Sequence, residues 1–167
     1  IQNEIPFFIE DEEVISLIRR GQEYENQTNG YFNPAIGKLV SLWGFHSEVP
    51  RKVMPDARSI SKLVKAKPSM ENIKIVNNIL SSTNKFVQVD MGGYAKGYAL
   101  DQAKNILEQY NINNALINIG GNILALGMQG KKEWIVGIQD PRNPNLMASL
   151  PLKPGWSIGT SGDYQKY

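Results

Sequence analysis

Asp90 and Lys96 lie on either side of a glycine pair within Val87–Asp101, and their types and spacing suggest chemistry more than any others in the chain. A short β-branched run ends at Asp90, then Gly92 and Gly93 follow, and a helical pattern begins within a few residues. A strand, a tight turn and a helix N-terminus together present backbone N–H groups and a positive dipole end to an anion. The segment is equally explained as a phosphate site, with or without a metal, or as a plain chain reversal.

Three further segments carry residues suited to binding. Ile117–Asn122 sets two glycines between apolar runs, which favours a hairpin with positive φ over close approach of a ring or a phosphate. Tyr31 and Phe32 adjoin the amide of Asn33, and core packing explains the two rings as well as ligand contact does. Gly159–Tyr164 follows a predicted strand with hydroxyls and glycines, which is typical of a phosphate-binding strand end or of a turn.

Other chemistry-bearing residues receive plainer interpretations. Trp43–Phe45 is expected to belong to the core. His46 is the sole histidine and has no serine or second histidine at a recognisable spacing, so it is a poor catalytic candidate. The cationic runs Leu17–Arg20 and Lys62–Lys67 are expected to be solvated helix faces.

Composition limits the possible functions. A chain of 167 residues with net charge +2 and scattered Lys and Arg predicts one domain, spanning residues 1–167, without a nucleic-acid surface. The absence of Cys excludes thiol catalysis and disulfides. No apolar run approaches the ~20 residues of a spanning helix, and the given residues show no signal-peptide pattern. Because the chain begins at Ile1, we expect that upstream sequence has been removed, with any leader or lipid anchor.

The candidate residues are positioned by helices and strands that the apolar spacing predicts. Helices are expected over Asp11–Thr28, from Asp56 to about Lys65, and over Ala95–Tyr110. Strands are expected over Ile73–Val76, Ile79–Ser82, Phe86–Val89, Ala115–Ile119, Ile123–Gly127, Trp134–Ile138, Ser149–Leu152 and Ser157–Thr160. Helices come first, and a β-α-β unit and a meander follow, so the order predicts an α+β fold rather than a doubly wound sheet.

Five ordered segments together resemble the ApbE family, the flavin transferases that move FMN from FAD onto proteins. They are Thr28–Phe45, Val89–Asp101, Asn118–Asn122, Trp134–Pro144 and Thr160–Tyr164, and they span nearly the whole chain. The family more often has Asp at the position of Asn33.

The resemblance implies a fold and site residues. The implied fold is α+β, related to the T-fold, with a mixed or antiparallel sheet and packed helices. Tyr31, Phe32 and Asn33 fall where the family contacts the flavin nucleotide, and Asp90 and Lys96 fall at further FAD contacts. The backbone carbonyl of Gly93 falls where the family supplies a ligand to Mg²⁺, for which a main-chain oxygen is a suitable hard donor.

The implied reaction is attack by a Ser or Thr hydroxyl of an acceptor protein on the FMN-side phosphorus of FAD, with AMP leaving. Mg²⁺ would neutralise the pyrophosphate, and Asp90 is a hypothetical base for the hydroxyl proton. Two alternatives are an Mg²⁺-dependent FAD pyrophosphatase, which releases FMN and AMP, and a non-catalytic flavin-binding protein. The family usually works outside the cytoplasm, often as a membrane-anchored lipoprotein held by an N-terminal lipid.

Parts of the family pattern are absent from the sequence. Beyond Tyr167 the family continues with a His-containing segment and with a helix whose Asp and Thr ligate Mg²⁺, and upstream it has an aromatic against the isoalloxazine. We therefore expect a protein ending at Tyr167 to bind Mg²⁺ and FAD poorly and to transfer nothing. Flavinylation of a Thr-containing acceptor by residues 1–167 alone would contradict this expectation.

Overall fold

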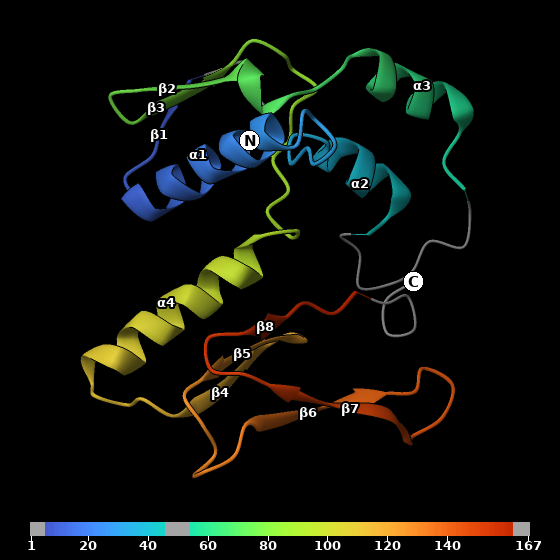
Figure 1. The fold of residues 1–167 in the computed structure, drawn as a ribbon. Coiled ribbons are helices and arrows are strands. Elements are labelled where there is room, and N and C mark those ends of the chain that lie inside the picture. The colour runs from blue at the N-terminus through green and yellow to red at the C-terminus, as the bar shows by residue number, and fades with distance from the viewer. Residues whose placement is uncertain (1–5, 46–53, 162–167) are drawn as a thin grey trace. The chain divides into compact units, whose positions relative to one another are not determined.

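The computed structural model describes residues 6–45 and 54–161 (Figure 1). The chain forms two compact units, of which the first ends at Gly93 and the second begins at Tyr94. No helix of the described residues is long and apolar enough to cross a membrane.

In the residues that the structure describes, the first unit combines three α-helices with a small antiparallel sheet. Its elements are β1 (Phe7–Phe8), α1 (Glu12–Gln27), α2 (Gly37–Trp43), α3 (Ala57–Lys65), the 3₁₀ helix η1 (Met70–Asn72), β2 (Ile73–Val76) and β3 (Ile79–Ser82). The strand order is β1-β3-β2, and both pairs are antiparallel. Asn77 and Asn78 join β2 to β3 with φ of 50° and 61°, a left-handed pair that matches the twist of a tight hairpin.

Two aspartates determine where the longer helices of this unit begin. Asp11 precedes α1 and accepts a hydrogen bond from the Glu13 backbone N–H at 2.8 Å. Asp56 precedes α3 and accepts one from the Ser59 backbone N–H at 3.0 Å. Both carboxylates satisfy N–H groups that a helix start leaves unpaired. Hydrogen bonds from the hydroxyl and the backbone N–H of Ser59 lower the pKa of the Asp56 carboxyl below its usual value.

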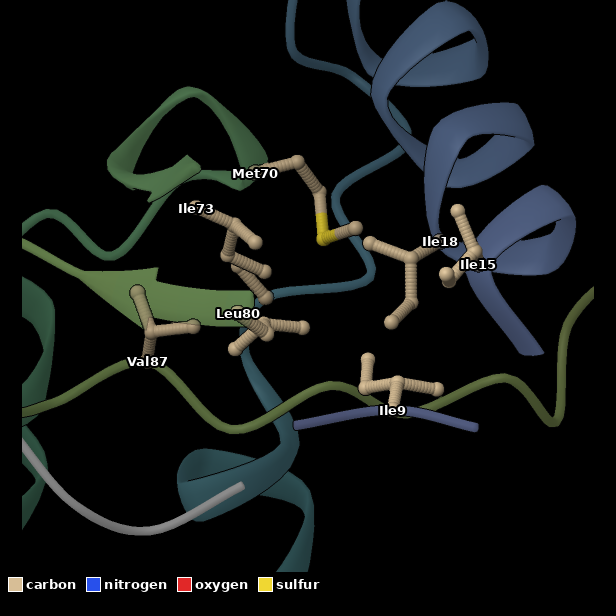
Figure 2. Packing of buried hydrophobic residues seen from close by; sticks show 8 residues of the cluster. Ile9, Ile15, Ile18, Met70, Ile73, Leu80 and Val87 are labelled. Carbon is tan, nitrogen blue, oxygen red and sulfur yellow. The ribbon is translucent and has the colours of Figure 1, made fainter. Parts of the chain in front are cut away.

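One apolar cluster lies between α1, η1 and the strands, as Figure 2 shows. Its members are Ile9, Ile15, Ile18, Ala35, Met70, Ile73, Leu80 and Val87. Glu25 is also buried, and its carboxylate accepts hydrogen bonds from the Ser69 hydroxyl at 3.0 Å and the Met70 backbone N–H at 2.7 Å. Because both donors lie at the start of η1, this buried carboxylate holds η1 against α1.

Ile18→Ala should destabilise the first unit strongly, because Ile18 is 0% exposed and faces Met70 and Leu80 across the cluster (Figure 2). Removing a buried aliphatic side chain costs about 2–5 kcal/mol through lost apolar contact and the cavity left behind. The matched control is Ile106→Ala, because Ile106 lies on a helix of the second unit with 52% of its surface exposed. Urea unfolding should show a large fall in midpoint for the first variant and a small one for the control, and equal falls would contradict this account of the core.

The described part of the second unit has one helix beside antiparallel strands. Its elements are α4 (Ala95–Gln109), β4 (Ala115–Ile119), β5 (Asn122–Leu126), β6 (Trp134–Gln139), β7 (Leu146–Leu152) and β8 (Ser157–Ile158). One sheet has the order β4-β5-β8, and β6 pairs with β7 in another. Ala125, Val136 and Leu152 form the buried cluster of this unit. Separate helices and antiparallel sheets confirm the predicted α+β class.

Most predicted elements are confirmed to within a few residues, but Phe86–Val89 is not a strand. Gln88 forms an isolated parallel bridge with Ile36. The partner segment becomes helix α2 at Gly37, so the ladder has no further extended residues with which to pair. The strand β1 was not predicted, and at two residues it is too short to show an alternating pattern.

Trp43 and Phe45 are not core residues, contrary to the prediction. They lie at the C-terminal end of α2, where Gly44 takes a left-handed conformation with φ of 84°. Trp43 is 39% exposed and Phe45 is 67% exposed. His46 lies outside the described residues, as do Gly162, Asp163 and Tyr164 of the last predicted segment.

Candidate functional site

Backbone hydrogen bonds join the segment after Asn33 to the segment that ends at Asp90. The Asp90 N–H donates to the Pro34 carbonyl at 2.8 Å, and the Gln88 N–H donates to the Ala35 carbonyl at 3.1 Å. In return, the Gly37 N–H donates to the Gln88 carbonyl at 2.7 Å. Two candidate segments that are far apart in sequence are therefore adjacent in the first unit.

The two candidate aromatics differ in environment. The Phe32 N–H donates to the Thr28 hydroxyl at 3.0 Å, and the Phe32 ring meets the Tyr24 ring edge-on, with centroids 6.2 Å apart. Tyr31 is 96% exposed, so core packing does not explain it. The structure thus holds Phe32 in place and leaves the Tyr31 ring open to solvent.

The side-chain amide of Asn33 makes hydrogen bonds to the backbone through both its nitrogen and its oxygen. Its Nδ2 donates to the Pro68 carbonyl at 2.8 Å, and its Oδ1 accepts from the Ala35 N–H at 2.8 Å. An aspartate at this position has no N–H to offer Pro68, which gives a physical reason for an amide in this chain. The amide positions the segment that pairs with Asp90, and a contact between Asn33 and FAD remains a prediction.

The Asp90 carboxylate lies in the turn that leads to α4. Its Oδ1 accepts a hydrogen bond from the Gly92 N–H at 2.8 Å, which is an Asx-type turn. Neither Gly92 nor Gly93 is among the residues of positive φ, so the turn does not need glycine for its backbone angles. Nor does Asp90 cap the helix, because the N-cap residue of α4 is Tyr94, which makes no side-chain capping bond.

Space is the reason for glycine at position 93. A Cβ built on Gly93 would lie 2.9 Å from Cε2 and 3.2 Å from Cζ of Phe32. Both distances are shorter than ordinary van der Waals contact, so the Phe32 ring lies directly against the main chain of the turn. This contact joins the aromatic candidate to the glycine whose carbonyl is the predicted Mg²⁺ ligand.

Gly93→Ala is expected to displace the Phe32 ring rather than the backbone, since the clash is with the far end of a side chain. The cost should be about 1–3 kcal/mol of folding stability, as for other overpacking changes. In a Phe32→Leu background the same substitution should cost much less. A double-mutant cycle by urea unfolding measures this coupling, and an additive cycle would show that the two residues do not interact.

Residues from three predicted segments also lie close to one another within the second unit. The Lys96 Nζ donates to the Gly120 carbonyl at 3.1 Å, and the Asn118 Oδ1 accepts from the Gly121 N–H at 3.0 Å. Gly120 and Gly121 have φ of 55° and 86°, which confirms the predicted hairpin turn between β4 and β5. A Cβ on Gly121 would lie 3.5 Å from Thr160, so the last segment also reaches this turn.

The described residues do not form a complete metal site. They include no group of three or more His, Asp or Glu side chains that could together hold a metal ion. Asp90 and the Gly93 carbonyl are oxygen donors of the kind that Mg²⁺ prefers, but this ion takes about six ligands.

Sequence reasoning did not identify the residues that bring the site together. Pro34, Gly37 and Gln88 carry the backbone pairing, although none of them has a reactive side chain. Gly37 gave no signal in the sequence, because the helix that it begins, α2, was not predicted. A Cβ there would lie 2.5 Å from the Gln88 carbonyl oxygen, so close backbone approach explains this glycine.

The comparisons with known proteins agree on one protein family. A sequence model of the ApbE family matches residues 3–167. A FAD:protein FMN transferase of Rhodobacter capsulatus is 35% identical over 157 residues, which cover 94% of this chain and 30% of that protein. Another from Klebsiella pneumoniae is 30% identical over 165 residues, with coverage of 93% and 46%.

Solved structures agree in fold. The crystal structure of the ApbE protein of Thermotoga maritima matches with a TM-score of 0.81 at 32% identity, over 98% of this chain and 53% of that one. The flavin transferase ApbE of Vibrio cholerae matches with a TM-score of 0.78 at 26% identity, over 99% and 54%. The chain spans less than half the length of these curated relatives and about half of these solved chains.

Proposed function

This chain belongs to the ApbE family, and we propose that the protein carrying it transfers FMN from FAD to an acceptor protein. The observation that best supports the proposal is the backbone pairing of residues 34–37 with residues 88–90. It brings an aromatic segment suited to a flavin beside a carboxylate and a glycine turn suited to a pyrophosphate.

The proposed chemistry is substitution at the FMN-side phosphorus of FAD. A Ser or Thr hydroxyl oxygen of the acceptor forms a bond to phosphorus, the pyrophosphate P–O bond breaks, and AMP leaves with the electron pair. Asp90 accepts the hydroxyl proton in this proposal. Its Oδ1 is already fixed by the Gly92 N–H, so the carboxylate is held in one orientation before the acceptor arrives.

The residues proposed to bind FAD lie close in sequence to the paired segments 34–37 and 88–90. We assign Tyr31 and Phe32 to the flavin, because Tyr31 is exposed and Phe32 is held against the turn at Gly93. The contact of Lys96 with FAD is proposed on resemblance, and its ammonium already binds the Gly120 carbonyl.

A role for Mg²⁺ is also proposed from the resemblance to the ApbE family. When bound, Mg²⁺ offsets pyrophosphate charge and stabilises the leaving oxygen. The Gly93 carbonyl would supply one ligand. The described residues contain no group of His, Asp or Glu side chains that would complete the ligand set. Location outside the cytoplasm through an N-terminal lipid also stays a prediction.

The test uses the intact protein with FAD, Mg²⁺ and a protein that carries an exposed Ser or Thr acceptor. We expect flavin fluorescence and the mass of FMN to appear on the acceptor, one AMP to be released per transfer, and EDTA to stop the reaction. FMN released free in equal amounts with and without the acceptor would replace this proposal by a FAD pyrophosphatase. FAD binding without AMP would indicate a flavin-binding protein.

A further inference from the structure

Three lysine ammonium groups surround a single aromatic ring in the first unit. The Nζ atoms of Lys38, Lys62 and Lys85 lie 5.9, 5.7 and 5.8 Å from the centroid of the Phe86 ring. Each distance is within the range of a cation–π contact. The lysines come from α2, from α3 and from the segment before Gln88, so tertiary structure brings them together. We call these three lysines with Phe86 the lysine patch.

The lysine patch has no counter-charge in the described part of the chain. None of its three ammonium groups pairs with a carboxylate there; Lys38 donates to the Lys85 backbone carbonyl instead. Residues 57–67, which include α3, add Arg58, Lys65 and Lys67 and contain no Asp or Glu. Like charges gathered around one ring repel one another, since physiological salt screens only over a Debye length of about 8 Å.

From this unpaired charge we propose that the lysine patch docks an acidic segment of a partner protein. A single carboxylate would be held poorly, because an exposed lysine–carboxylate pair contributes at most about fivefold in affinity. Lys62 and Lys85 are exposed, so the patch suits a partner that brings several carboxylates at once rather than one enclosed anion. Phe86 is half-buried beneath the lysines, and this position favours an acidic polypeptide over insertion into a membrane.

The lysine patch adjoins the candidate site along the chain. Lys38 follows the paired residues 34–37, and Lys85 precedes the paired residues 88–90. An acidic segment bound to the patch would therefore place its protein near residues 34–37 and 88–90. Identifying this partner as the FMN acceptor rests on the proposed function, whereas the docking of an acidic segment does not.

The test measures binding of a fluorescein-labelled Glu-Gly repeat peptide to the intact protein by fluorescence anisotropy. Combined substitution Lys38→Gln, Lys62→Gln and Lys85→Gln should weaken binding about tenfold or more. The matched control is Lys74→Gln, Lys131→Gln and Lys132→Gln, which removes the same charge from exposed positions and should change binding less than about threefold. Equal weakening in the two variants would overturn the proposal.

Two further variants keep the test decisive if the first variant does not fold. Lys62→Gln with Lys85→Gln leaves the Lys38 contact intact and should still weaken binding, while Lys62→Arg with Lys85→Arg retains the charge and should bind normally. Pyrophosphate and vesicles of phosphatidylserine with phosphatidylcholine serve as competitors. No peptide binding by the unmodified protein at low salt, or stronger binding to the vesicles than to the peptide, would also refute docking of an acidic segment.

Transfer assays separate this inference from the proposed function. The patch variant should raise the KM for an acidic acceptor protein and leave kcat nearly unchanged. If no FMN transfer occurs in the unmodified protein but the peptide result holds, the proposed function fails and the docking site remains. If transfer occurs and the lysine substitutions change neither binding nor KM, the docking inference fails alone.

Discussion

Asp90→Asn in the intact protein is expected to lower kcat for FMN transfer by about 10²–10⁴-fold, the usual effect of removing a general base. Asparagine keeps the size of the side chain and the oxygen that accepts the Gly92 N–H, so the turn should persist. The affinity for FAD should change by no more than a few fold. Single-turnover transfer and FAD titration, measured on the same sample, give the two quantities.

Asp140→Asn is the matched control for this substitution. Asp140 also accepts a backbone N–H two residues ahead, from Arg142 at 2.8 Å, but it lies in the turn between β6 and β7. Its amide variant should transfer FMN at the normal rate. If Asp90→Asn instead abolished FAD binding while the protein stayed folded, the carboxylate would be a binding group and its role as base would be unsupported.

Gly37→Ala is expected to break the backbone pairing that unites the site. The new Cβ would lie 2.5 Å from the Gln88 carbonyl oxygen and 3.1 Å from the Gln88 carbonyl carbon, and backbone atoms cannot move aside as a side chain can. We expect the free energy of unfolding to fall by about 1–3 kcal/mol or more. Amide hydrogen exchange should show lost protection at the Gln88 and Asp90 N–H groups, and FAD binding should weaken with it.

Gly97→Ala provides a control of opposite sign. Gly97 lies inside α4, and a Cβ there would meet no atom within 4 Å apart from the local backbone of its own helix. Alanine exceeds glycine in helix propensity by about 1 kcal/mol, so this variant should be more stable than the unmodified protein. Protection at Gln88 and Asp90 should be unchanged. Normal protection in Gly37→Ala would mean that the two segments are not held by this close approach.

The lysine patch and the Gly37 contact were not predicted from the sequence, because both join residues that are distant in the chain. Lys62 in the run Lys62–Lys67 was predicted to lie on a solvated helix face, and it is exposed, but no spacing rule reveals that Lys38 and Lys85 share its aromatic neighbour. Contacts between residues that are distant in the chain depend on how helices and loops pack. Local patterns do not contain this information.

Local chemistry made many elements predictable. Asp11 and Asp56 cap helices because their carboxylates accept the N–H groups of the residues that follow. Asn77-Asn78 and Gly120-Gly121 form hairpin turns because they tolerate positive φ. The order of motifs was sufficient to indicate the ApbE family, which the family match over residues 3–167 confirms.

Tertiary structure decided which candidate residues meet. The sequence determined the residue types at Phe32, Asp90 and Gly93, but their proximity depends on hydrogen bonds between residues 34–37 and 88–90. It also decided why two glycines are needed: Gly93 leaves room for Phe32, and Gly37 leaves room for the Gln88 carbonyl. A glycine in a sequence is usually interpreted as a source of backbone flexibility. Only the atoms packed against Gly37 and Gly93 show that these positions need a residue without a side chain.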